Sequence, residues 1–200
     1  MIPVSEPEAA SGRCEWTHLD AAAKRERLLV AATEVFARDG LDAPMSVVAD
    51  AAGAGVASVY RLFESKRELL AALVVRRMDT IAAAAVEAYE SPGDRWSALT
   101  QMLTNLVSGQ RADYLIGDAR AAVADHLDVI AAVTRASEAQ ERLLAAARAE
   151  GRLRADATTL DLRLVFAATR AARRVEPEHW QRMLELMIDA LDADRGTTVR

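Results

Sequence analysis

Apolar residues recur at spacings of three and four positions along most of the chain, which is the period of one helix face. The first segment with this pattern follows Asp20, a good helix cap, and ends before Gly40, which suits the left-handed position after a helix. Its apolar positions are Leu28, Leu29, Ala32, Val35 and Phe36. Alternating apolar and polar runs are nearly absent, so the pattern predicts an all-α protein of about nine helices.

Two short apolar segments come next, one opening at Pro44 and one covering Val56–Phe63, with Gly53 and Gly55 between them. Two short helices joined by a tight, glycine-containing turn are typical of a helix-turn-helix, whose second helix enters the major groove of DNA. The segment 46–63 is therefore the candidate for DNA binding.

The later helices are longer. Ser65 and Glu68 have the spacing of a capping box at the start of one that runs to about Tyr89. Further helices are expected from Trp96, from about 125 to 150, from 160 to 175 and from 177 to about 193. Residues 1–19 show no apolar period, so we expect a flexible N-terminal tail that includes Trp16.

Composition narrows the class of protein. The net charge is −5, which argues against a non-specific nucleic-acid binder, yet Gly55 to Arg77 carries five basic and two acidic residues. Cys14 is the single cysteine, so no intrachain disulfide is expected. With no signal-peptide pattern and no membrane-length apolar run, the expectation is a cytoplasmic protein without a membrane partner.

Four stretches of the sequence, 27–36, 40–44, 52–63 and 65–70, together resemble the TetR family of bacterial regulators. They run in register through several helices and their turns. The resemblance implies a three-helix DNA-binding domain, a linking fourth helix and a helical ligand-binding and dimerisation domain. The expected division is a tail at 1–19, the helix-turn-helix domain at 20–66, the ligand-binding and dimerisation domain at 67–194, and a frayed end at 195–200.

The resemblance also implies DNA contacts from Ser58, Tyr60 and Lys66. The further candidates for DNA binding are Arg27, Ser46, Gly55, Val56, Ala57 and Arg61. Small residues at the start of the second helix allow a close approach, and Val56 and Ala57 offer apolar contact to thymine methyl groups. For Arg61, a phosphate contact and a place on a solvated helix face are about equally expected. Leu62 stands where the family often has His, so a DNA contact from that position is left open.

Two further sites are expected in the second domain. The candidate ligand-pocket residues are Trp96, Met102, Leu103, Leu106, Tyr114, Phe166 and Arg170, with plain core packing as the alternative for each. The resemblance implies a dimer interface in which the last two helices pair with their copies. The last helix carries the candidate stripe, namely Trp180, Met183, Leu184, Met187, Ile188 and Leu191. Arg170, Arg173 and Arg174 either bind an anionic ligand or pair with acidic neighbours.

Other chemistry finds little support. The stretch Gly53–Ser58 nearly matches a dinucleotide-binding motif, but a helix and not a strand precedes it. His18, His126 and His179 lack metal-ligand spacing, so structural or surface roles are expected, with no metal and no cofactor. The sequence thus predicts a non-enzymatic, homodimeric transcriptional repressor, released from double-stranded operator DNA by a small molecule. The alternative is a helical ligand-binding or interaction protein with impaired DNA binding.

Overall fold

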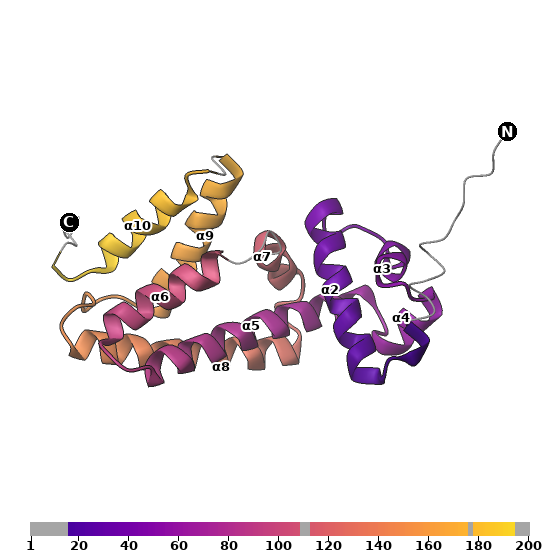
Figure 1. Ribbon diagram of the computed structural model, residues 1–200, viewed down its shortest axis with the longest axis horizontal. Coiled ribbons are helices and arrows are strands. Elements are labelled where there is room, and N and C mark those ends of the chain that lie inside the picture. The colour runs from indigo at the N-terminus through magenta and orange to yellow at the C-terminus, as the bar shows by residue number, and fades with distance from the viewer. Residues whose placement is uncertain (1–15, 109–112, 176–177, 195–200) are drawn as a thin grey trace. The chain divides into compact units, whose positions relative to one another are not determined.

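The computed structural model describes residues 16–108, 113–175 and 178–194 (Figure 1). Over these ranges every regular element is a helix, as the periodicity predicts. The helices are α2 (Ala21–Asp39), α3 (Met45–Ala52), α4 (Val56–Leu62), α5 (Lys66–Glu90), α6 (Arg95–Ser108), α7 (Asp113–Ala122), α8 (Leu127–Ala149), α9 (Thr159–Val175) and α10 (Trp180–Leu191). None of these described helices is long and apolar enough to cross a bilayer.

Local chemistry explains where several helices begin and end. The Asp20 carboxylate accepts a hydrogen bond of 2.8 Å from the Ala23 amide at the start of α2. Gly40 ends that helix with φ of 84° and ψ of 169°, a conformation that a side chain would strain. The Ser65 hydroxyl accepts from the Glu68 amide at 3.2 Å, so half of the expected capping box is present.

The chain forms two compact units, and their boundaries differ from those expected at 66 and 67. The first unit holds the described residues within Met1–Val75 together with those within Arg111–Val129. The second holds those within Arg76–Gln110 and Ile130–Arg200. The boundary falls inside α5, and α7 joins the first unit, because α7 packs on α2 and the residues after it bond to the start of α5.

The first unit is built around α2, which packs on α3, while α3 packs on α4. Its fully or almost fully buried side chains are Leu28, Phe36, Val48, Val59, Phe63 and Leu69. Leu28 and Phe36 are among the apolar positions that the three- and four-residue spacing places on one face of α2. α3 is therefore held by burial against α2, and α4 by burial against α3.

Trp16 departs from the sequence expectation. Residues 16–18 form a helical turn and the Trp16 side chain is only 6% exposed, whereas the sequence pattern predicts a flexible tail there. One isolated tryptophan carries no periodic signal, although burying it removes a large apolar surface from water. Cys14 and the rest of the expected tail, residues 1–15, lie outside the described residues.

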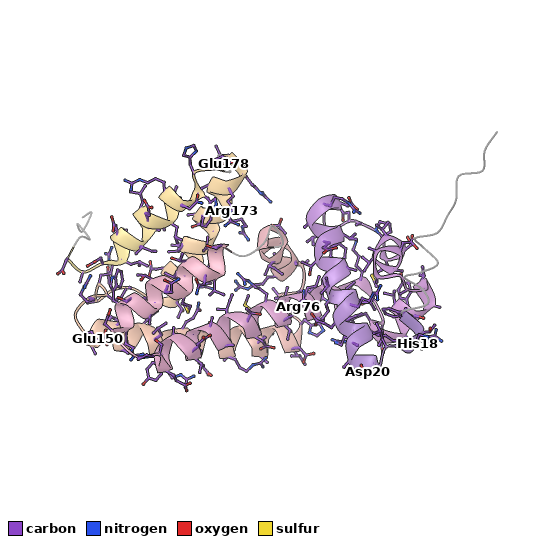
Figure 2. The ribbon with its side chains drawn as sticks, in the orientation of Figure 1. His18, Asp20, Arg76, Glu150, Arg173 and Glu178 are labelled. Carbon is purple, nitrogen blue, oxygen red and sulfur yellow. The ribbon has the colours of Figure 1, made fainter. Side chains whose placement is uncertain are left out.

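The second unit has one apolar core, to which α5, α6, α8, α9 and α10 all contribute. α9 and α10 pack against each other. The Arg95 guanidinium donates to the carbonyls of Ala88 and Gly93. Its backbone amide donates to the carboxylate of Glu150, which Figure 2 labels. This arginine satisfies carbonyl groups at the end of α5 that have no partner inside the helix.

Candidate nucleic-acid interface

The turn between α3 and α4 depends on one left-handed glycine. Gly53 has φ of 68° and ψ of 25°, and the Ala54 amide behind it donates to the Ala49 carbonyl at 2.8 Å. The Ala54 side chain is buried, which fixes the turn against the helices. Gly55 has an ordinary extended backbone at the start of α4, so its φ does not require glycine. A Cβ added to Gly55 would meet no atom within 4 Å, so the space beside it is open.

α4 turns one buried residue inward and most of its side chains outward. Val59 is completely buried and anchors the helix. Val56, Ala57 and Arg61 are exposed, and Tyr60 is 47% exposed although it is a large aromatic residue. An exposed apolar and aromatic helix face with a cation is suited to contact base edges and phosphates in a groove.

Two of the predicted contact residues on α4 touch each other. The Arg61 guanidinium donates to the Ser58 hydroxyl at 3.1 Å, and Ser58 itself is half-buried. This contact holds the guanidinium over the outward face of α4. The arginine keeps further N–H donors for a phosphate, because a guanidinium has five.

The remaining predicted residues lie on other helices of the first unit and differ in exposure and in their contacts within the chain. Ser46 is exposed in the first turn of α3. Lys66 begins α5 and its ammonium lies 5.7 Å from the centre of the Phe36 ring, which positions the side chain. Arg27 is half-buried and interacts within the chain, so it is a weaker candidate for a DNA contact than the exposed residues.

Sequence reasoning missed Arg25. Its guanidinium lies 4.4 Å from the centre of the Phe63 ring and donates to the Leu62 carbonyl at 3.5 Å. It thereby supports the end of α4 from α2. A separation of 37 residues leaves no spacing signal that could have revealed the pair. Leu62, where a DNA contact was left open, is half-buried next to this arginine.

Glu68 and His126 form another pair within the first unit. His126 Nε2 lies 3.2 Å from a Glu68 carboxylate oxygen, so this carboxylate faces His126 and does not complete the capping box. The pairing gives His126 a structural role, as expected for an isolated histidine. The described residues hold no group of three His, Cys, Asp or Glu placed to bind a metal ion.

The predicted ligand-pocket residues lie in the second unit, where most are core. Trp96, Met102, Leu103 and Leu106 are buried in the apolar cluster, and Phe166 packs against it. The Tyr114 side chain lies outside the described residues. The packing fits the simpler alternative for these residues, and their role as pocket residues stays a prediction.

The three arginines of α9 have different surroundings. Arg173 donates to the Val107 carbonyl at 2.6 Å and stacks 3.9 Å from the centre of the Trp180 ring (Figure 2). Arg174 is exposed and interacts within the chain. Arg170 is half-buried and has no polar partner among the described residues.

An open groove lies elsewhere in this unit, between α5 and α8, with a volume of about 710 Å³. Its walls are small apolar residues bordered by two arginines and two glutamates: Ala82, Val86, Arg135, Glu138, Ala139, Glu141, Arg142 and Ala145. None of them is among the predicted pocket residues. The mixed charges leave the chemistry of an occupant undetermined.

The predicted dimer stripe on α10 is only partly available to a partner. Leu184 and Leu191 are buried, and Trp180, Met187 and Ile188 pack against the core of their own chain. The exposed apolar surface continues instead along α9, where Leu160, Leu164, Ala171 and Val175 are exposed at helical spacing, with Leu186 exposed on α10. The sequence analysis places α9 in the expected interface but does not identify these α9 residues, because small and charged residues weaken the apolar period.

Comparison with known proteins agrees with the geometry. The model of the family described as bacterial regulatory proteins, tetR family, matches residues 28–73. A TetR transcription regulatory protein from Mycobacterium vanbaalenii is 33% identical, with a TM-score of 0.55, and the match covers 79% of this chain and 95% of that one. No curated protein matches the chain.

Two more distant structures share the fold. A transcriptional regulator of the TetR family from Agrobacterium tumefaciens is 18% identical, with a TM-score of 0.65 over 87% of this chain and 100% of that one. SmeT, in the structure of its complex with triclosan, is 23% identical, with a TM-score of 0.58; the match covers 88% of this chain and 95% of that one. The chain belongs to the TetR family and is a DNA-binding transcription regulator with a helix-turn-helix.

Proposed function

We propose that this regulator is a homodimeric repressor that reads operator DNA with α4 and releases it when a small molecule binds the second unit. The single observation that carries the proposal is the outward face of α4, where Val56, Tyr60 and Arg61 are exposed while Val59 anchors the helix. The protein is proposed to act in the cytoplasm, by binding and not by catalysis.

The proposed contacts divide into two kinds. Arg61, Lys66 and the Tyr60 hydroxyl are suited to phosphate oxygens, which position the protein on the duplex. Val56 and Ala57 are suited to thymine methyl groups, which carry sequence information. Gly55 leaves room for a close approach of the backbone because no atom occupies the space beside it.

Dimerisation is supported by the exposed apolar stripe of α9. Leu164 is 51% exposed, and Leu160 and Val175 continue the stripe. Exposed apolar stripes of this kind mark protein–protein interfaces. A two-fold dimer places two recognition helices on half-sites about one helical turn of DNA apart, or a multiple of that distance.

Response to a small molecule is supported by the second unit, whose described regular elements are all helices and which belongs to a chain that shares its fold with the triclosan complex of SmeT. A ligand changes DNA affinity only if it binds the DNA-competent and DNA-incompetent conformations with different affinity. The effector must therefore lower the affinity for operator DNA by the same factor by which operator DNA lowers the affinity for the effector.

The experiment that tests the proposal is fluorescence anisotropy of the full chain on DNA from around its own gene, at two salt concentrations, with scrambled DNA as competitor. We expect binding that resists the competitor and weakens steeply with salt. Binding that scrambled DNA abolishes, followed by failure to select any sequence from random DNA, would instead favour an interaction protein with impaired DNA binding. Arg142→Ala is a matched control, because Arg142 is an exposed arginine of the second unit.

A further inference from the structure

Gln140 is a polar residue in the apolar face of α8. Its side chain is 6% exposed, and its helix neighbours Ala136, Leu143, Leu144 and Ala147 are all buried in the core of the second unit. Periodicity alone assigns this position to an apolar residue. A glutamine here therefore needs a reason other than packing.

The amide of Gln140 has no hydrogen-bond partner among the described residues. The two other buried polar residues of this unit both have one. The Thr169 hydroxyl donates to the Val165 carbonyl at 2.8 Å, and the Asp192 carboxylate accepts from Arg152 at 3.3 Å. Gln140 is thus the exception within the described core.

This amide also keeps contact with space that water can reach. Among the described residues that are not exposed, every side-chain nitrogen or oxygen that is fully sealed from solvent has a hydrogen bond. Since the Gln140 amide has no bond, it must retain some accessible surface although its residue is almost wholly buried. An amide that is ready to bond therefore stays partly accessible among the buried apolar side chains of α8.

We propose that Gln140 is the polar anchor of the effector site, and that the effector is an uncharged, mainly apolar molecule with one hydroxyl or carbonyl group. The inference rests on the proposed ligand response and names the chemistry of that ligand. An amide both donates and accepts, so it bonds a hydroxyl or a carbonyl. None of the described buried residues of this unit is a cation, and Arg170 is only half-buried, so an anionic group beside Gln140 would have no buried counter-charge.

The proposal explains why the chain keeps an amide there. A buried amide without a partner destabilises the fold, and an apolar side chain of the same shape removes that penalty. A residue held for packing alone has the opposite property, because its replacement lowers stability. Gln140→Leu and Gln140→Met are therefore expected to melt at the same temperature as the wild-type protein or higher.

The test uses the full chain and three probes of similar size: phenol, toluene and benzoate. NMR follows the side-chain amide signals of Gln140, which are assigned by their loss in Gln140→Leu. We expect phenol to shift these signals and to bind more tightly than toluene by about fivefold, the worth of one net hydrogen bond. Gln140→Leu and Gln140→Met should bind phenol and toluene equally. Gln101→Leu, which alters an exposed glutamine, should keep the wild-type preference.

Three results would overturn the proposal. The first is that no probe shifts the Gln140 signals, as expected if only water reaches this amide. The second is that benzoate binds most tightly, which would make the effector an anion. The third is that both Gln140 variants melt at a lower temperature and still prefer phenol.

Operator binding separates this inference from the proposed function. Gln140→Leu is expected to bind operator DNA as the wild-type protein does, because Gln140 lies in the second unit. If the wild-type protein binds operator but shows no preference for phenol, only the assignment of Gln140 fails. If no operator is bound by any variant, the proposed function fails whatever the probes show.

Discussion

Arg67 and Asp125 join two segments of the first unit that lie 58 residues apart in sequence. An Nη atom of Arg67 is 2.5 Å from a carboxylate oxygen of Asp125, and the other Nη donates to the Ala122 carbonyl at 3.0 Å. One guanidinium therefore holds both the end of α7 and the residue before His126. The adjacent Glu68 repeats the connection by facing His126.

This arrangement predicts a pH dependence. The hydrogen bond from Arg67 holds the pKa of the Asp125 carboxyl below its ordinary value. Because the native pKa is lowered, the pair stabilises the fold above the ordinary carboxyl pKa and loses that effect as the pH falls through the lowered one. In Arg67→Gln, NMR titration should show the pKa of Asp125 rising, with little change in stability at neutral pH, since the pair is exposed.

Asp156 provides the internal control for that titration. Its carboxyl pKa is lowered in the same way by a hydrogen bond from Arg154, in the other unit. It should be unchanged in Arg67→Gln. A pKa of Asp125 that stays low in this variant would show that Arg67 is not the cause.

Arg61→Ala is expected to weaken operator binding modestly and to reduce the slope of log affinity against log salt by about 0.9, the value for one phosphate contact. Anisotropy titrations at several salt concentrations measure both quantities. Arg142→Ala changes the same charge in the second unit and should leave both unchanged. Unaltered affinity in Arg61→Ala would remove this residue from the interface.

Gly55→Ser should separate stability from DNA binding. Serine is a good helix N-cap and the space beside Gly55 is open, so the melting temperature should stay the same or rise. The added side chain should weaken operator binding. Gly151→Ser should lower the melting temperature and leave operator binding unchanged. Gly151 has φ of 77°, a backbone conformation that destabilises a residue with a side chain by about 1 kcal/mol, and it lies in the second unit. Wild-type affinity in Gly55→Ser would mean that the backbone there stays away from DNA.

Leu164→Glu is expected to convert the dimer to a monomer, because it places a charge in the exposed apolar stripe of α9. Light scattering after gel filtration measures the mass directly. Leu127→Glu is the matched control, since Leu127 is 80% exposed but lies on α8. A Leu164→Glu protein that remains a dimer would place the interface elsewhere.

Leu103→Ala distinguishes core from pocket. Leu103 is completely buried in the apolar cluster, so its truncation should lower the free energy of unfolding by about 2–5 kcal/mol. Urea unfolding measures this loss, and Leu127→Ala should cost far less. A cost for Leu103→Ala close to that of Leu127→Ala would instead indicate that Leu103 lines open space.

The helix ends and the helix-turn-helix were accessible from sequence because their chemistry is local. The Asp20 cap, the Gly40 stop and the Ser65 cap each depend on residues within four positions of one another. The apolar period of α2 likewise identified the side chains that are buried. A single chain carries such signals without any relative for comparison.

The missed features depend on residues that meet only after folding. Arg25 reaches α4 across 37 residues, and Glu68 reaches His126 across 58. The stripe on α10 was identified as apolar, but its division between the core and an outer surface depends on where α9 lies. Sequence periodicity identifies an apolar face of a helix, but it does not identify the element that packs on that face.

The division of roles along α4 has a consequence for how such a regulator can change over evolutionary time. Folding of the helix depends mainly on Val59, whereas Val56, Ala57, Tyr60 and Arg61 project into solvent. Substitutions at exposed positions usually alter stability by no more than about 0.5 kcal/mol. Mutation can therefore vary these four positions while selection for a folded protein remains satisfied. Changes at Val56 and Ala57, the proposed base contacts, give a duplicated copy a route to a new DNA target in single steps.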